Sequence, residues 1–130
     1  MGHWSLLINM FLKSIFVTIA TSKLDILVQF YTNLIGIEPE SYIPQIYAEF
    51  QLTNLHLGIF QPKEAQSQEF YTGKSPISLC FEVSGLEGAI AHITALGYPP
   101  PGEIINASHG REIYAYDPDG NRIIFYQSKD

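Results

Sequence analysis

The second half of this 130-residue chain repeats the pattern of its first half at an offset of 61 to 67 residues. Tyr47-Ala48 recurs as Tyr114-Ala115, and the run from His56 to Gln61 is matched by the run from Arg122 to Gln127. Solenoid proteins stack shorter units at least three times, so this repeat is not a solenoid unit. It instead predicts one domain built from two related halves, with pseudo-twofold symmetry and a site between them.

Composition narrows the class of protein. Apolar residues make up 46% of the chain and charged residues 15%, which fits a single globular domain over residues 1–130. The net charge of −6 and the lack of a Lys/Arg cluster argue against a nucleic-acid partner. One cysteine, Cys80, excludes an internal disulfide framework and favours a reducing compartment, so we expect a cytoplasmic protein.

The apolar residues 1–12 allow two interpretations. They lack the basic segment and the cleavage site of a signal peptide, and they are too short to span a bilayer, so no membrane partner is expected. Met10 is one candidate for the natural start, which makes residues 1–9 an upstream extension. In the alternative interpretation, these apolar residues form an added strand or a dimer contact.

Each half is predicted to contain a strand, a helix and three further strands. In the first half, alternation predicts a strand over 12–21, and apolar residues at helical spacing predict a helix over 24–36. Ser22 is the expected N-cap of this helix, and Gly36 is its expected end. The three short strands are expected at about 38–44, 46–52 and 55–61.

The second half follows the same order after a polar linker at 62–75. A strand is expected over 77–83. Ser84 and Glu87 have the spacing of a capping box at the start of a helix over 86–97. The last three strands are expected at about 103–108, 111–117 and 121–128.

These elements predict an α+β fold. Two tandem βαβββ modules, about 12–61 and 76–128, are expected to form a cupped, barrel-like mixed sheet with the helices on the outside. Alternation divides the strand residues between two faces. The uniformly apolar face, expected under the helices, holds Val17, Ile19, Leu55, Leu57, Ile59, Leu79, Phe81, Val83, Ile123 and Phe125.

The opposite strand face mixes aromatic, polar, charged and small residues, which is typical of a small-molecule cavity. An ordinary solvent-exposed sheet face is the alternative. The residues predicted to contact a ligand are Phe16, Thr18, His56, Phe60, Ser78, Cys80, Glu82, Tyr116, Arg122, Ile124 and Tyr126.

A family resemblance is carried by residues 110–127, in which the turn Asp117-Pro118-Asp119-Gly120-Asn121 follows a tyrosine-rich strand. This segment resembles the C-terminal signature of the vicinal oxygen chelate superfamily. That superfamily groups glyoxalase I, bleomycin resistance proteins, extradiol dioxygenases and methylmalonyl-CoA epimerase. The runs Leu24 to Gly36 and Leu86 to Gly97 are similar to its two helices, so the resemblance covers residues 12 to 128.

The resemblance implies a divalent metal held by four inward side chains, usually His, Glu, His or Gln, and Glu. In this sequence the four positions fall on Phe16, Gly58, Ser78 and Ile124. None is a competent ligand, because a lone serine hydroxyl binds divalent ions poorly and the others offer no side-chain donor. We therefore predict no metal site and no cofactor, which removes the chemistry on which glyoxalase I and the dioxygenases depend.

Other potential ligands lie close to these four positions. His56, Glu82 and Glu49 are the nearest, whereas His92 and His109 are interpreted as surface histidines.

Catalytic roles have little support in the sequence. Cys80 has no basic neighbour and is interpreted as a small buried residue rather than a nucleophile. Glu82 and Arg122 are interpreted either as an ion pair or as a general base beside an anion-binding group.

The expected function is therefore to bind or sequester a small molecule, with no catalytic residue assigned. Bleomycin resistance proteins of this superfamily work without a metal, as dimers, and the acidic charge shared with them favours a cationic ligand. Phe16, Phe60, Tyr116 and Tyr126 suit an aromatic one. The alternatives are a glyoxalase- or dioxygenase-like enzyme with displaced ligands, a metal-free lyase or isomerase, and a non-enzymatic interaction module. A homodimer is expected, because pairing covers exposed strand edges.

Overall fold

The computed structural model describes residues 14, 16–71, 75–108 and 110–129. The interpretations of residues 1–9 and of His109 lie outside these ranges. The first module consists of β1 (Val17–Ala20), α2 (Leu24–Ile35), β2 (Ser41–Ile43), β3 (Tyr47–Gln51) and β4 (His56–Phe60). The second consists of β5 (Leu79–Glu82), α3 (Leu86–Ala95), β6 (Ile105–Ala107), β7 (Gly110–Tyr116) and β8 (Arg122–Ser128).

The predicted order of elements is confirmed, with two local differences. The polar linker contains a 3₁₀ helix, η1 (Glu64–Glu69), which its polar composition did not indicate. The first strand begins at Val17 among the described residues, so Phe16 precedes it and is 46% exposed. No helix in the described part of the chain is long and apolar enough to cross a membrane.

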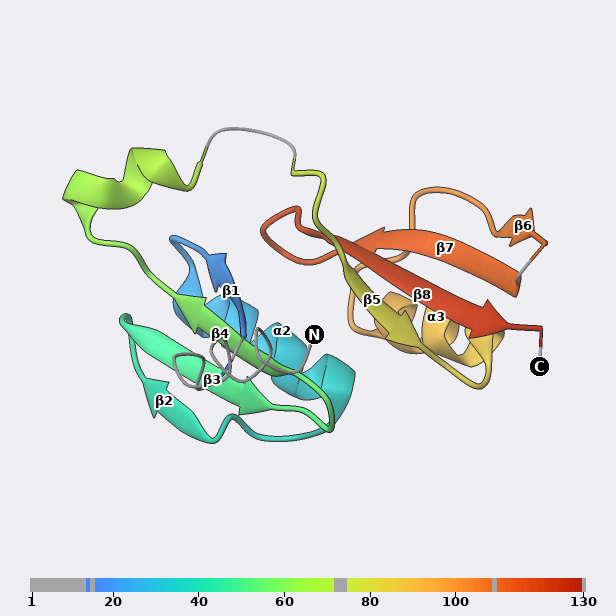
Figure 1. Ribbon diagram of the computed structural model, residues 1–130, viewed down its shortest axis with the longest axis horizontal. Helices are drawn as coiled ribbons and strands as arrows, with labels where there is room; N and C mark the ends of the chain where they lie inside the picture. Colours follow the sequence, from blue (N-terminus) through green and yellow to red (C-terminus); the bar gives the residue numbers. More distant parts are fainter. Residues whose placement is uncertain (1–13, 15, 72–74, 109, 130) are drawn as a thin grey trace, which may run out of the picture.

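Each module forms one mixed sheet of four strands, in the order β1-β4-β3-β2 in the first module and β5-β8-β7-β6 in the second. The pairs β1–β4 and β5–β8 are parallel, and the other pairs are antiparallel. Figure 1 shows the sheets as separate units with both helices behind them. The two-module α+β prediction is confirmed, and the sheets do not close into a barrel.

The apolar strand face packs under the helices, as predicted. Leu57, Ile59 and Ile123 are fully buried, and they share one core cluster with Leu27 of α2 and Ile93 of α3. Because the cluster draws on both modules, burial of apolar surface stabilises the two halves together. Leu55 is half-buried just before β4, outside this cluster.

The predicted N-terminal caps of the helices are wrong, whereas Gly36 ends α2 in a left-handed conformation, as predicted. Helix α2 begins after Lys23 and α3 after Gly85, and neither start has a side-chain cap from Ser22 or Ser84. Instead, the Gln127 side-chain oxygen accepts the first backbone N–H of α3 at 2.8 Å. Capping satisfies an N–H group that has no partner within the helix. Here the acceptor comes from β8, so the local sequence at the helix start could not indicate it.

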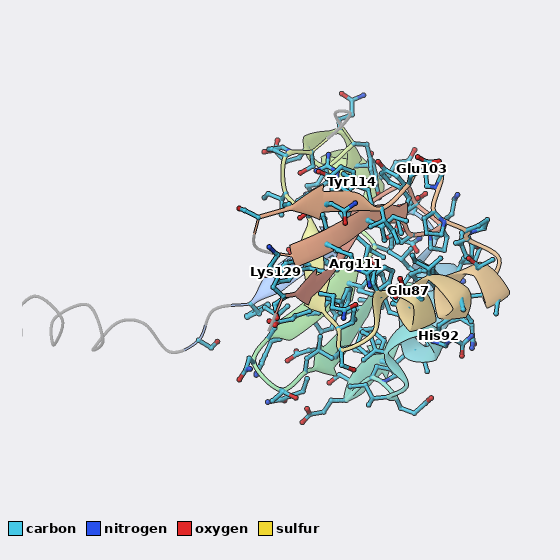
Figure 2. All side chains as sticks on the ribbon, turned by 90° about the vertical axis from the view of Figure 1, so that its right-hand side faces the viewer. Glu87, His92, Glu103, Arg111, Tyr114 and Lys129 are labelled. Atoms are coloured by element: carbon cyan, nitrogen blue, oxygen red, sulfur yellow. The ribbon has the colours of Figure 1, made fainter. Side chains whose placement is uncertain are left out.

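An ion pair also ties the start of α3 to its sheet. Arg111 of β7 donates to both carboxylate oxygens of Glu87, at 2.6 and 2.9 Å, and the two side chains lie side by side in Figure 2. This hydrogen bonding lowers the pKa of Glu87 to about 2. Glu87, which was predicted to form a capping box, instead links the start of α3 to β7 through Arg111.

The modules meet along α2. The Tyr98 ring packs edge-on against Phe30 with ring centroids 5.2 Å apart. His92 Nε2 lies 3.0 Å from the Asn33 carbonyl oxygen and 3.2 Å from that of Leu34, near the end of α2. His92 is exposed, as expected, and bonds carbonyl groups that a helix end leaves without partners. These contacts fix the second module against the first.

Candidate functional site

The turn between β7 and β8 is organised by the carboxylate of Asp117, which is only 3% exposed. Its Oδ1 atom accepts the backbone N–H groups of Asp119 and Asn121 at 2.8 and 2.9 Å. Its Oδ2 atom accepts the Asn121 amide at 2.8 Å and the Tyr31 hydroxyl of α2 at 2.7 Å. Burial, followed by the charge of Asp117, raises the pKa of Tyr31 well above its usual value. The turn is thereby fixed both internally and to the first module.

Docking of this turn creates a cavity of about 480 Å³ between the modules. Figure 1 shows the turn reaching from the second module toward the first. The cavity walls are β1, the residues after η1, the start of β5 and the turn itself. Four of the residues predicted to contact a ligand line it together: Thr18, Ser78, Tyr116 and Arg122. The cavity therefore lies between the two halves, where the repeat predicts a site.

Arg122 is the positively charged side chain among the described residues that line this cavity. Its Nη1 atom donates to the Ser78 hydroxyl at 2.9 Å, and its Nη2 atom donates to the Ser75 carbonyl at 3.2 Å. Asp119 also lines the cavity, and its carboxylate lies 4.0 Å from the ammonium group of Lys23. The predicted pairing of Glu82 with Arg122 is wrong, because Glu82 lies opposite Tyr126 toward the other end of β8.

The open face of the first sheet carries a polar network. The Tyr47 hydroxyl donates to Glu49 at 2.8 Å, and His56 Nδ1 lies 3.4 Å from the second oxygen of Glu49. Gln51 Nε2 lies 2.9 Å from His56 Nε2, which fits a tautomer with the ring proton facing Glu49. Burial and the hydrogen bond to Glu49 raise the pKa of Tyr47. His56 is thus engaged at both ring nitrogens.

The open face of the second sheet places Ile124 between Cys80 and Tyr114. Cys80 is exposed, so its interpretation as a buried residue is wrong. Burial of part of the side chain, followed by the charges of Glu112 and Glu82, raises the pKa of the thiol. A thiol with a raised pKa holds less thiolate, the nucleophilic form.

The remaining residues predicted to contact a ligand do not line the cavity. The Phe60 ring packs edge-on against Phe70, with centroids 5.1 Å apart. Sequence reasoning did not identify Phe70 and Tyr71, which line the cavity from the end of the linker. Their position depends on η1, which was not predicted. The others outside the lining are Phe16, His56, Cys80, Glu82, Ile124 and Tyr126.

The four positions of the family's metal site do not fit a divalent ion. A Cβ atom on Gly58 would lie 3.1 Å from the Tyr47 hydroxyl oxygen, so the Tyr47 side chain occupies the space where a ligand side chain would extend. The Ser78 hydroxyl accepts a hydrogen bond from Arg122, which places a cation beside that position. Phe16 and Ile124 carry no donor atom. Across the described ranges, no group of three or more His, Cys, Asp or Glu side chains is arranged to hold a metal.

Comparisons with known proteins agree with this fold. The family model described as Glyoxalase/Bleomycin resistance protein/Dioxygenase superfamily matches residues 13–125. No protein with a curated description matches the chain.

Similar solved structures come from several bacteria. A lactoylglutathione lyase from Agrobacterium tumefaciens has a TM-score of 0.68 and 19% identity, covering 89% of this chain and 94% of that one. A glyoxalase-related enzyme from Fulvimarina pelagi has a TM-score of 0.72 and 18% identity, with coverage of 90% and 89%. A fosfomycin resistance protein from Listeria monocytogenes has a TM-score of 0.72 and 17% identity, with coverage of 91% and 94%. Together with the family match over most of its length, this fold places the chain in the glyoxalase/bleomycin resistance protein/dioxygenase superfamily.

Proposed function

We propose that this protein binds a small molecule in the cavity between β1 and the β7–β8 turn. The observation that carries the proposal is the convergence of Thr18, Ser78, Tyr116 and Arg122 on one cavity from separate strands. Its volume of about 480 Å³ lies within the range of roughly 300 to 1,000 Å³ that is usual for ligand sites. No step is assigned to a metal, because the four family positions do not fit one.

The walls of the cavity favour a planar ligand. Tyr116, Phe70 and Tyr71 all line it, and aromatic rings stack well on flat apolar surfaces. The net charge of −6 attracts cations at long range, but Arg122 repels a cation inside the cavity. Of the two expected ligand classes, cationic and aromatic, the proposal therefore keeps the aromatic one.

The network on the first sheet supports a second candidate, metal-free acid–base catalysis by His56. Glu49 orients the imidazole, as the partner of a general base does. The Gln51 amide must move before His56 Nε2 can accept a substrate proton. For this reason we rank binding above catalysis.

We also propose that the protein is a homodimer. Strands β2 and β6 form the outer edges of their sheets, and near β2 the side chains of Ile43 and Ile46 are 52% and 59% exposed. An unpaired edge with apolar side chains is a surface that a second copy can cover. Light scattering at micromolar concentration should give twice the chain mass of 14.6 kDa. A monomer mass for the full chain contradicts this part of the proposal.

A planar fragment set, titrated into the protein and followed by NMR of the backbone amides, tests binding. We expect fragments to shift resonances of Thr18, Ser78 and Tyr116. Thr18→Phe places a ring in the cavity and should abolish these shifts, whereas Thr53→Phe adds the same ring on an exposed turn and should preserve them. Fragments that bind equally to both variants would show that the ligand site lies elsewhere.

A further inference from the structure

Arg122 stands in the cavity wall with neutral hydrogen-bond partners. It donates to the Ser78 hydroxyl at 2.9 Å and to the Ser75 carbonyl at 3.2 Å. A guanidinium has five N–H donors in a planar fork, so these bonds fix its orientation and leave donors for a further acceptor. The side chain is half-buried, which weakens the solvation of its charge.

The only other arginine of the chain, Arg111, has a carboxylate partner. It donates to both carboxylate oxygens of Glu87, and one of its nitrogens also donates to the Gln127 side chain at 3.0 Å. Arg122, by contrast, has no carboxylate of the described residues within ion-pair distance. Among the described residues, the cavity therefore contains an oriented cation that has no carboxylate partner.

The acidic residue of the cavity wall does not supply that anion. The Asp119 carboxylate lies 4.0 Å from the ammonium group of Lys23. Lys23 thus offsets part of the charge of Asp119, and the guanidinium of Arg122 has no such partner among the described residues of the cavity wall.

Aromatic side chains line the same cavity as the guanidinium. Tyr116 lies opposite Arg122 in the β7–β8 ladder, and Phe70 and Tyr71 enter from the end of η1. Their exposed fractions are 38%, 46% and 45% respectively. Large rings left this exposed around a concave site are a ligand-contact surface rather than core.

We infer that the cavity binds a planar aromatic carboxylate, with the carboxylate on Arg122 and the ring against Tyr116. This inference rests on the proposed function and names the chemical class of its ligand. The guanidinium fork matches a carboxylate with two parallel hydrogen bonds, and such charge-assisted bonds are stronger than neutral ones. Ser78 holds the fork in place before the ligand arrives.

The test uses benzoate, benzamide and benzylamine as probes of the full chain, followed by NMR of the backbone amides. The probes share a ring and differ in the charge of the polar group. Benzoate should shift the amides of Thr18, Ser78 and Arg122 and bind at least about tenfold more tightly than benzamide, because a hydrogen bond to a charged group contributes more than a neutral one. Benzylamine should bind most weakly, since Arg122 repels its ammonium group.

Variants locate the preference on one side chain. Arg122→Gln should abolish the preference for benzoate, and Arg122→Lys, which keeps the charge without the fork, should retain part of it. Lys129→Gln removes the same charge from an exposed residue outside the cavity lining and should leave the preference unchanged.

The outcomes separate this inference from the proposed function. Equal affinity of the wild type for benzoate and benzamide overturns the inference and leaves binding in the cavity standing. No amide shift in the cavity with any of the three probes overturns both. The comparison of probes on the wild type holds even if Arg122→Gln fails to fold.

Discussion

The two modules share a topology and differ on their open faces. In the first module, Tyr47, Glu49 and His56 form a network whose polar groups bond one another. In the second, Arg122 bonds neutral groups and faces a cavity. The buried face of both copies had to stay apolar for the core to form. The open faces were free to diverge, and the cavity lies where the second copy meets the first.

The family's metal positions are also replaced differently in the two copies. In the first module, Tyr47 occupies the space beside Gly58. In the second, Ser78 is engaged by an arginine, and Ile124 lies between Cys80 and Tyr114. In the first module the position for a metal ligand is sterically covered. In the second module a positively charged side chain lies beside one position, and neither position offers a strong metal ligand. Restoring metal binding therefore requires more than replacing four side chains.

The largest predicted effect concerns the junction between the modules. Asp117→Ala removes the acceptor of the buried Tyr31 hydroxyl and of two turn N–H groups, so we expect it to lower the free energy of unfolding by about 3 kcal/mol. Asp25→Ala is the matched control, because it removes the acceptor of the exposed Tyr42 hydroxyl and should cost less than about 1 kcal/mol. Urea denaturation measures both values. Similar losses in the two variants would show that the turn does not join the modules.

The second-largest predicted effect is the loss in free energy of unfolding when one glycine in each module is replaced by alanine. Gly110 has a φ of +155°, and a Cβ atom there would lie 2.3 Å from the Gln127 carbonyl oxygen, which is backbone and cannot yield easily. Gly58→Ala meets the movable Tyr47 side chain instead, at 3.1 Å. We expect Gly110→Ala to lower the free energy of unfolding by about 2 to 4 kcal/mol and Gly58→Ala by less than about 1. Thermal unfolding that ranks the two variants in the opposite order contradicts the described packing of β7 on β8.

Much of the fold is predictable from the sequence, because the positions of strands and helices depend on local periodicity. Alternation along the strands separated the buried Ile59 and Ile123 from Thr18 and Arg122, and three- and four-residue spacing located both helices. The repeat also indicated that a site would lie between the halves.

What could not be predicted depends on contacts between distant side chains. The bond from Tyr31 to Asp117 joins residues 86 positions apart, and the cap from Gln127 to α3 spans 41. Tyr47 covers Gly58 only because β3 and β4 pair in a particular register. A single sequence carries no local signal for any of these contacts.

A smaller effect is expected from acid. The pKa of Glu87 is lowered from 4.5 to about 2 by its bonds with Arg111, so this pair contributes stability above pH 4.5 and loses it as the pH falls toward 2. Because Glu87 is fully exposed, the contribution is small. Glu87→Gln should flatten the dependence of the melting temperature on pH between 4.5 and 2. A slope identical to that of the wild type would mean that the pair does not persist in solution.

The smallest predicted effect tests the central claim, that the duplicated halves now enclose an organic ligand site in place of a metal centre. Calorimetric titration of the unmodified protein with Ni²⁺ or Zn²⁺ should give only weak, non-stoichiometric heats, because Tyr47 covers one position and Arg122 engages another. The same protein pretreated with a chelator should keep its melting temperature and its response to aromatic probes. Saturable binding of one metal ion per chain, with a dissociation constant below about 1 μM, would contradict the account.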